Sequence, residues 1–255
     1  MATPSMPAVS PYSDLEGPGG KRAVSSYDAI VRAGFIRKVY AILTIQLLVT
    51  SGTGALFMLH HDVRNFVTHT PSLLYTALFL PIAFIIALHC YKDKHPHNMY
   101  ILGGFTICEA YTVGVICAMY QESGMGMIVL QACFSPASRT ALMLTAAIFI
   151  SLTAYTLNTK TDFSFLGAGL FAGLVVLIVW GLLNMFFDFG IGGRMVFSLI
   201  GALLFAGFIL YDTSQILTNL GPDDYVIGAI NLYLDIINLF LYLLEFLRML
   251  QGGSD

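Results

Sequence analysis

The strongest constraint on this chain is a series of long apolar stretches separated by short polar segments. One of them, FLGAGLFAGLVVLIVWGLLNMFF (residues 165–187), contains no charged residue. A helix needs about 20 mainly apolar residues to cross the hydrocarbon core of a bilayer. We therefore predict an all-α membrane protein, a bundle of seven transmembrane helices. The predicted helices cover residues 39–59, 72–90, 99–120, 139–157, 165–187, 195–217 and 224–250.

The composition supports a membrane location. Hydrophobic residues make up 57% of the chain and charged residues 11%, with a mean hydropathy of +0.78. Soluble domains are about 45–50% apolar and about 25% charged. The apolar runs are also unbroken, whereas the strands of a β-barrel alternate in polarity. The net charge of -3 is too small to indicate nucleic acid or another strongly charged partner, so the lipid bilayer is the expected surrounding.

The N-terminal region differs from the rest of the chain. Residues 1–33 contain four of the nine prolines and few apolar residues, which predicts a disordered cytosolic tail. No short apolar run with a small-residue cleavage site lies near Met1, so no signal peptide is expected. The transmembrane domain is predicted to span residues 34–250, followed by a short C-terminal tail at 251–255.

The distribution of Lys and Arg predicts the orientation. Cytoplasmic segments of membrane proteins carry an excess of these residues. Eight of them flank one side of the predicted helices and three flank the other, which places the N-terminus in the cytosol. The first set is Lys21, Arg22, Arg32, Arg37, Lys38, Lys92, Lys94 and Lys160, and the second is Arg64, Arg139 and Arg194.

Neither the cysteines nor the histidines form a metal-binding pattern. The four cysteines lack a C-x-x-C spacing and are interpreted as packing thiols; they are Cys90, Cys108, Cys117 and Cys133. His95 and His97 lie two apart in a short loop without a third clustered ligand, which favours a solvated loop over a zinc site. No metal and no cofactor are expected.

Ionisable residues within the apolar stretches are the candidate functional residues. Glu109, Asp212 and Asp235 each lie inside a predicted helix, where a charge costs at least about 2.5–3.5 kcal/mol unless it faces the bundle interior. Asn231 and Asn238 share one helical face with Asp235. This polar face predicts a central position for the last helix, although the two asparagines are equally compatible with simple interhelical hydrogen bonding.

Asp212 and Asp235 are predicted to meet. The short link TNLGPDDY (residues 218–225) makes their helices antiparallel neighbours, and both aspartates are similarly distant from the turn. They should therefore lie at the same depth, on the cytosolic side of the membrane core. Two close carboxyls in a low-dielectric site should share one proton and titrate as a coupled unit.

Four segments resemble a known family. GALLFAGFILYDTSQIL (201–217) and DDYVIGAINLYLDIINLFLYLLEFL (223–247) resemble the C-terminal motif of the Bax inhibitor (lifeguard) family. GFIRKVYAILTIQLLVT (34–50) and YTLNTKTDFSFLGAGLF (155–171) are similar to its Golgi anti-apoptotic branch. The resemblance covers about residues 34–250.

The resemblance implies a seven-helix bundle with the last helix at its centre. It implies that Asp212 and Asp235 form a pH-responsive latch on a calcium leak of the Golgi or endoplasmic reticulum, which lowers store calcium and suppresses apoptosis. We expect Asn231, Asn238 and Glu109 to support the pore or the latch, with Ca²⁺ as the permeant ion and proteins of apoptosis or calcium handling as further partners.

Two departures from the family pattern affect this expectation. Bacterial relatives pair an arginine of the second helix with the aspartate of the sixth, but residues 72–90 contain no Lys or Arg. The segment CFSPASRTA (133–141) interrupts the region before the fourth helix, which predicts a displaced helix start and a separate half-helix at MIVLQA (127–132).

The alternatives to an ion leak are an intramembrane aspartyl protease, a seven-helix receptor and a membrane scaffold. An intramembrane aspartyl protease also uses two aspartates on adjacent helices, but its Gly-x-Gly-Asp motif is absent, since Leu232, Tyr233 and Leu234 precede Asp235. A seven-helix receptor lacks a counterpart for its usual extracellular disulfide and long coupling loop. We therefore do not expect an enzyme. A non-conducting membrane scaffold for apoptosis or calcium-handling partners stays open as the alternative.

Overall fold

A computed structural model describes residues 29–91, 94, 96–122, 136–159, 162–187 and 189–252. All regular elements in these ranges are helical. They are α1 (Ala29–Leu59), α2 (His61–Thr68), α3 (Pro71–Tyr91), α4 (His97–Glu122), α5 (Pro136–Asn158), the 3₁₀ turn η3 (Ser164–Leu166), α6 (Gly167–Phe186), α7 (Gly190–Thr218) and α8 (Tyr225–Gly252).

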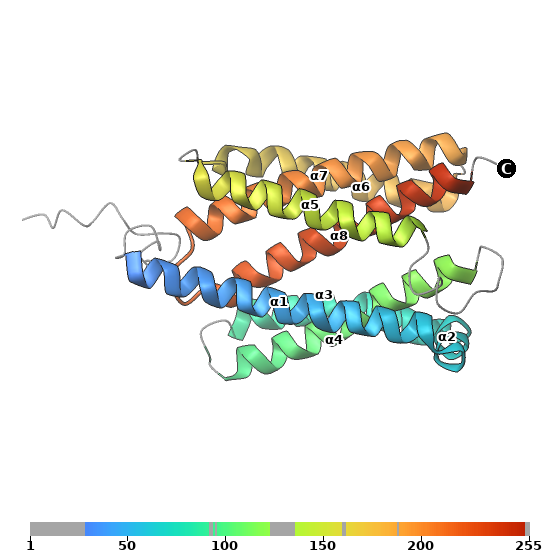
Figure 1. The fold of residues 1–255 in the computed structure, drawn as a ribbon, viewed down its shortest axis with the longest axis horizontal. Helices are drawn as coiled ribbons and strands as arrows, with labels where there is room; N and C mark the ends of the chain where they lie inside the picture. The colour runs from blue at the N-terminus through green and yellow to red at the C-terminus, as the bar shows by residue number, and fades with distance from the viewer. Residues whose placement is uncertain are drawn as a thin grey trace, which may run out of the picture.

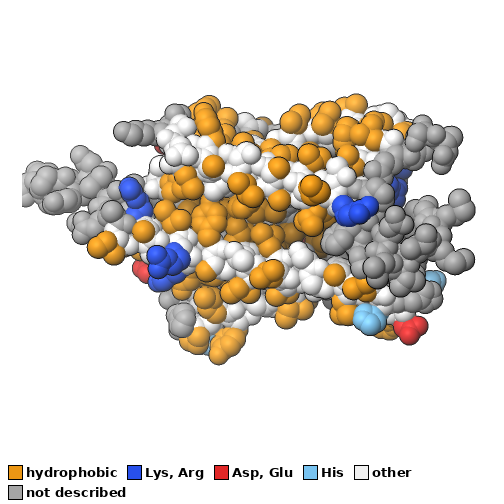
Figure 2. All heavy atoms as spheres, in the orientation of Figure 1, with side chains coloured by type: hydrophobic (Ala, Val, Ile, Leu, Met, Phe, Trp, Pro, Cys, Tyr) orange, Lys and Arg blue, Asp and Glu red, His pale blue; other side chains and the backbone are white. Residues whose placement is uncertain are grey.

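Six of the described helices are long and apolar enough to cross a membrane: α1, α4, α5, α6 with η3, α7 and α8. In α3 the apolar part, Phe79–Tyr91, is shorter than these six candidate membrane spans. Hydrophobic side chains cover most of the face shown in Figure 2, and Lys and Arg gather toward its two ends. The predicted all-α membrane protein is confirmed, whereas the count of seven spans stays a prediction.

The first helix begins earlier than the sequence predicted. α1 begins at Ala29 instead of residue 39, so residues 29–33 belong to a helix and not to the expected tail. The reason is an amphipathic first part: Phe35 and Val39, four residues apart, are buried, whereas Arg37 and Lys38 are exposed. Three of the basic residues used for the predicted orientation, Arg32, Arg37 and Lys38, therefore lie within α1 instead of preceding it.

A short helix, α2, was not predicted. It has eight residues, HDVRNFVT, and is too short and too polar to cross a membrane. Its Val67 is buried and clusters with Phe57 of α1 and with Val115 and Ala118 of α4. α2 therefore covers the end of the α1–α4 contact.

The helices form two groups with α8 between them. In Figure 1, α1 to α4 lie on one side, α5 to α7 lie on the other, and α8 runs diagonally between the two groups. α8 packs against α1, α4, α5 and α7. The largest of its almost fully buried side chains are Leu232, Tyr233, Leu239 and Leu244.

α5 begins at Pro136, within the segment that interrupts the predicted fourth helix. Proline is favoured in the first turn of a helix because its missing N–H would have no partner there. The start is therefore three residues before the expected residue 139. The half-helix predicted at 127–132 lies outside the described residues.

Candidate functional site

The structure brings Asp212 of α7 and Asp235 of α8 together. Their side chains are hydrogen-bonding neighbours, and they are only 9% and 5% exposed. The connecting turn is held by the backbone N–H of Gly221, which donates to Oδ2 of Asp224 at 3.2 Å. A hydrogen bond between two carboxyls needs a proton on one of them. The two carboxyls therefore lie side by side between two packed helices, α7 and α8.

One oxygen of this pair has no partner. Oδ2 of Asp235 is buried and makes no hydrogen bond with any described residue. The Asn231 side chain, exposed one turn before Asp235, hydrogen-bonds with Asp212. Asn238 is half-buried, and its Nδ2 donates to the Leu234 carbonyl of its own helix at 2.8 Å. Asn231 therefore belongs to the pair directly, whereas the amide nitrogen of Asn238 is engaged within α8.

The aspartate pair lies where two cavities meet. The larger cavity, of about 590 Å³, lies between α6, α7 and α8, and the smaller, of about 200 Å³, lies near the C-terminal end of α7. Tyr211, Asp212 and Asn231 line both. Asp235 and Asn238 line the larger one. Asp212 therefore lies at the junction of the two cavities, and Asp235 lies beside it on the side of the larger one.

A hydrogen-bonded loop fastens the start of α6 to the C-terminal end of α7, close to this junction. Oδ1 of Asp162 accepts from the Ser164 N–H at 2.9 Å, from its hydroxyl at 2.6 Å and from the Ser214 hydroxyl at 3.4 Å. The Ser164 oxygen accepts from Gln215 at 3.1 Å and from Asn219 at 3.0 Å. The hydrogen bonds from Ser164 hold the pKa of Asp162 below its ordinary value of 3.8.

Sequence reasoning did not find this loop. An aspartate two residues before a serine is a common local turn pattern, and TDFS (161–164) contains one. That signal predicts the bond from Asp162 to Ser164. It does not predict the contacts to α7, which depend on the tertiary packing of the loop.

Glu109 occupies a different place. It is half-buried in α4 and interacts electrostatically with Tyr233 of α8. It does not line either cavity at the aspartate pair. Its assignment as pore or latch support stays a prediction.

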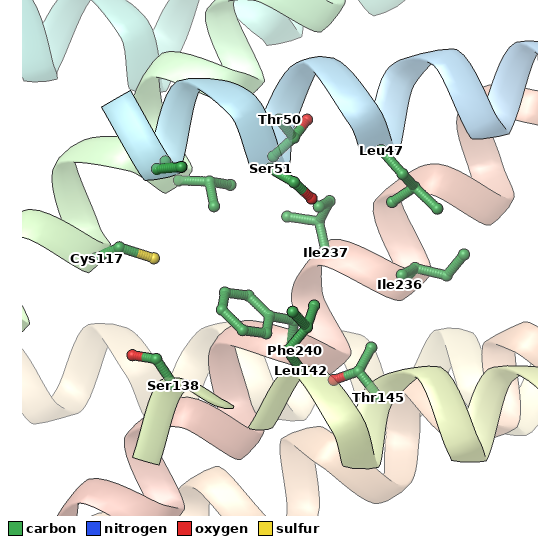
Figure 3. Close-up of a pocket in the computed structure, with 13 residues that line it drawn as sticks. Leu47, Thr50, Ser51, Cys117, Ser138, Leu142, Thr145, Ile236, Ile237 and Phe240 are labelled. Carbon is green, nitrogen blue, oxygen red and sulfur yellow. The ribbon is translucent and has the colours of Figure 1, made fainter. Parts of the chain in front are cut away.

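A separate cavity of about 100 Å³ lies between α1, α4, α5 and α8 (Figure 3). Phe240 and Ile237 of α8 project into it, and Cys117 lies on the α4 side. Its lining contains no charged residue. The hydroxyl of Thr145 donates to the Ala141 carbonyl at 2.7 Å, and that of Thr50 bonds to Tyr233 at 2.7 Å. The lining of this cavity is therefore mainly apolar, and its polar side chains are the hydroxyls of Thr50, Ser51, Ser138 and Thr145.

The described cysteines carry free thiols. Cys90 is exposed, Cys108 is half-buried and Cys117 is buried. Within the described ranges, no group of three or more His, Cys, Asp and Glu residues could hold a metal ion. Cys133 and His95 lie outside those ranges.

Comparisons with known proteins give one consistent result. A family model described as "Inhibitor of apoptosis-promoting Bax1" matches residues 32–252. The chain is 43% identical over 249 residues to the Golgi anti-apoptotic protein of Vaccinia virus (strain Lister), with 98% of each chain covered. It is 43% identical over 225 residues to Protein lifeguard 4 of Mus musculus, covering 88% of this chain and 89% of the relative. It is 42% identical over 227 residues to the BI1-like protein of Arabidopsis thaliana, covering 88% and 83%.

Proposed function

The chain belongs to the Bax inhibitor family, and on this basis we propose that it is a pH-sensitive calcium leak channel gated by Asp212 and Asp235. By this leak it lowers the calcium content of an intracellular store and suppresses apoptosis. The names of two relatives, a Golgi anti-apoptotic protein and a lifeguard protein, support an anti-apoptotic role in an intracellular membrane.

The observation that carries the proposal is the buried carboxyl pair at the junction of two cavities. In a low-dielectric site, two neighbouring negative charges repel strongly, so the protonated pair favours a closed junction. Loss of the shared proton adds repulsion between α7 and α8 and shifts the population toward an open junction. Carboxylate and amide oxygens are also the ligands that Ca²⁺ prefers.

The proposed arrangement is a seven-span bundle with α8 at its centre and the N-terminus in the cytosol. The smaller cavity then opens toward the cytosol, because it lies at the same end as the α7–α8 turn. α3 (Pro71–Tyr91) contains no Lys or Arg, so the closed state is held by the shared proton and by Asn231 in place of a salt bridge.

Calcium flux through liposomes containing the purified protein tests this proposal. We expect wild-type flux to change across about pH 5 to 8. Ordinary carboxyls are already ionised in this range, whereas the six histidines of the chain also titrate there, so variants of the aspartate pair are needed to assign the response. Asp212→Asn, Asp235→Asn and the double variant should flatten this response, because an amide keeps a hydrogen-bonding side chain but carries no titrating charge.

Asp62→Asn is the matched control, since Asp62 is an exposed carboxylate on α2 and lines neither cavity at the aspartate pair. It should leave the pH response unchanged. If both single variants at the pair keep the full wild-type response, the pair is not the sensor. If no ion passes through the wild type at any pH, the membrane scaffold becomes the better function.

A further inference from the structure

The larger cavity is long and has two chemically different ends. Along α7 its lining runs from Phe197 to Asp212. At 1.5 Å of rise per residue, this distance is about 22 Å. The aspartate pair and Asn231 lie at one end, and Phe197 with Gly181 lies at the other. The volume of about 590 Å³ is in the range of small-molecule sites, roughly 300–1,000 Å³.

The walls away from the aspartates are apolar, and the cavity is open within the membrane span. The apolar lining comes from Leu174, Leu177, Ile178, Phe197, Phe205 and Phe208. Ile178 is 55% exposed, and it lies on α6, one of the membrane-spanning candidates. A ligand can therefore enter from the lipid phase, and its tail must be apolar.

The polar end favours a cationic hydrogen-bond donor. It has two carboxyls, and no Lys or Arg is among the described residues that line the cavity. Oδ2 of Asp235 is buried without a hydrogen-bond partner in the described part of the chain, and burying such an acceptor unpaired is unfavourable. An ammonium group supplies both the positive charge and three N–H donors.

We propose that this cavity binds a single-chain cationic amphiphile, a long-chain primary amine. Its ammonium group bonds to Asp235 and Asp212, and its tail lies along α7 toward Phe197. A fatty acid of the same length is excluded because its carboxylate is repelled by the pair. A bound amine occupies the junction of the two cavities, so it also blocks any ion that passes there. The binding itself does not depend on conduction.

The chain contains its own reporter for this site. Trp180 is the single tryptophan, and its ring packs edge-on against Phe197 with centroids 5.6 Å apart. Phe197 lines the apolar end of the cavity. A bromine atom at the end of a bound tail would therefore quench the Trp180 fluorescence. The probe is hexadecylamine dibrominated at the tail end, whose extended chain matches the length of the cavity. It is added to the full-length protein in lipid nanodiscs, and the matched control probe is the corresponding alcohol.

We expect the amine to quench Trp180 saturably and the alcohol to quench it only in proportion to its concentration in the lipid. The apparent affinity for the amine should fall at least about tenfold in Asp235→Asn and in Asp212→Asn. Asp62→Asn should leave it unchanged. Unbrominated hexadecylamine should relieve the quenching in the wild type.

Equal saturable quenching by the alcohol, or an unchanged affinity in an aspartate variant that is monodisperse, would overturn the proposal. If Asp235→Asn aggregates, Asp212→Asn and the competition with hexadecylamine decide the question. The outcome is independent of the channel proposal. Saturable binding without any calcium flux would refute the channel and leave the amine site standing, and flux without saturable binding would do the reverse.

Discussion

Thr50 of α1 and Tyr233 of α8 share a hydrogen bond of 2.7 Å between the first and the last helix of the bundle. The Thr50 hydroxyl also donates to the Gln46 carbonyl at 2.9 Å, so the Tyr233 hydroxyl is the donor to Thr50. Both residues are buried, and the Tyr233 ring packs edge-on against Phe105 at 6.0 Å. This bond joins α8 to α1, in the group formed by α1 to α4. Asp212 lies in the other group, on α7.

Removing this bond should weaken the bundle measurably. Tyr233→Phe is expected to lower the free energy of unfolding by about 1 kcal/mol, because one buried hydrogen bond is lost while the ring contact is kept. Reversible unfolding in mixed micelles measures the change. In a double-mutant cycle with Thr50→Val, the coupling energy should lie near 0.6 kcal/mol and not exceed about 1.7 kcal/mol. Tyr75→Phe, at an exposed position of α3, is the control; strictly additive effects at 50 and 233 would contradict the prediction.

A glycine of α7 makes room for an aromatic ring of α8. A Cβ at Gly201 would approach Cδ1 of Tyr242 to 2.5 Å, and the Tyr242 ring is stacked on Phe205 at 5.8 Å. Gly201→Ala should therefore destabilise the bundle by about 1–3 kcal/mol, the usual cost of overpacking. Gly169→Ala in α6 is the matched control, since nothing lies within 4 Å of its Cβ position. Thermal unfolding of both variants measures the difference, and an equal effect would show that Tyr242 can move freely.

The loop at Asp162 should become weaker in acid. The pKa of Asp162 is lowered in the folded protein, so its contribution to stability is present above the ordinary value of 3.8 and is lost as pH falls through the folded-state pKa. Asp162→Asn removes the charge and should lower Tm near neutral pH by no more than about 4 °C, because the side chain is exposed. The difference in Tm between the variant and the wild type should vanish at low pH.

Asp223→Asn, an exposed position in the α7–α8 turn, is the control for this experiment. Its Tm should follow that of the wild type at every pH. A difference between Asp162→Asn and the wild type that persists in strong acid would mean that the charge of Asp162 is not what stabilises the loop.

Two N-terminal truncations, one that ends before α1 and one that ends within it, should have different effects on stability. Removing residues 1–28 should leave folded yield and Tm unchanged, because a segment with four of the nine prolines and few apolar residues buries little surface. Removing residues 1–38 also removes Phe35, which is 3% exposed, and should cost at least about 2 kcal/mol. Size-exclusion chromatography and thermal unfolding measure both; a loss on the shorter truncation would show that the segment packs on the bundle.

The meeting of the two aspartates followed from the sequence because it depends on local geometry. Asp212 and Asp235 are joined by a short link, and helical rise alone places them at similar depth. The positions of the long helices were predictable for a similar reason, since each apolar stretch is long enough to be recognised by itself. The start of α1 was not, because the alternation of Phe35 and Val39 with Arg37 and Lys38 has no long apolar run.

Features that depend on contacts between distant segments could not be predicted. The bonds from Ser164 to Gln215 and Asn219 require the α5–α6 loop to fold over the end of α7. The large cavity exists because α6 packs mainly against α7 and leaves the polar face of α8 partly uncovered. No pattern within the segment of α6 (Gly167–Phe186) indicates how closely it approaches α8.

The position of α8 has a consequence for biosynthesis. It follows every other described helix in the chain, yet it contacts members of both groups. Until the ribosome has made it, Asp212 has no carboxyl partner and Thr50 has no tyrosine partner, although the helices that carry them are already in the membrane. A chain that stops before Tyr225 would lack both of these partners, so the two groups of helices are joined only when the last helix has been made.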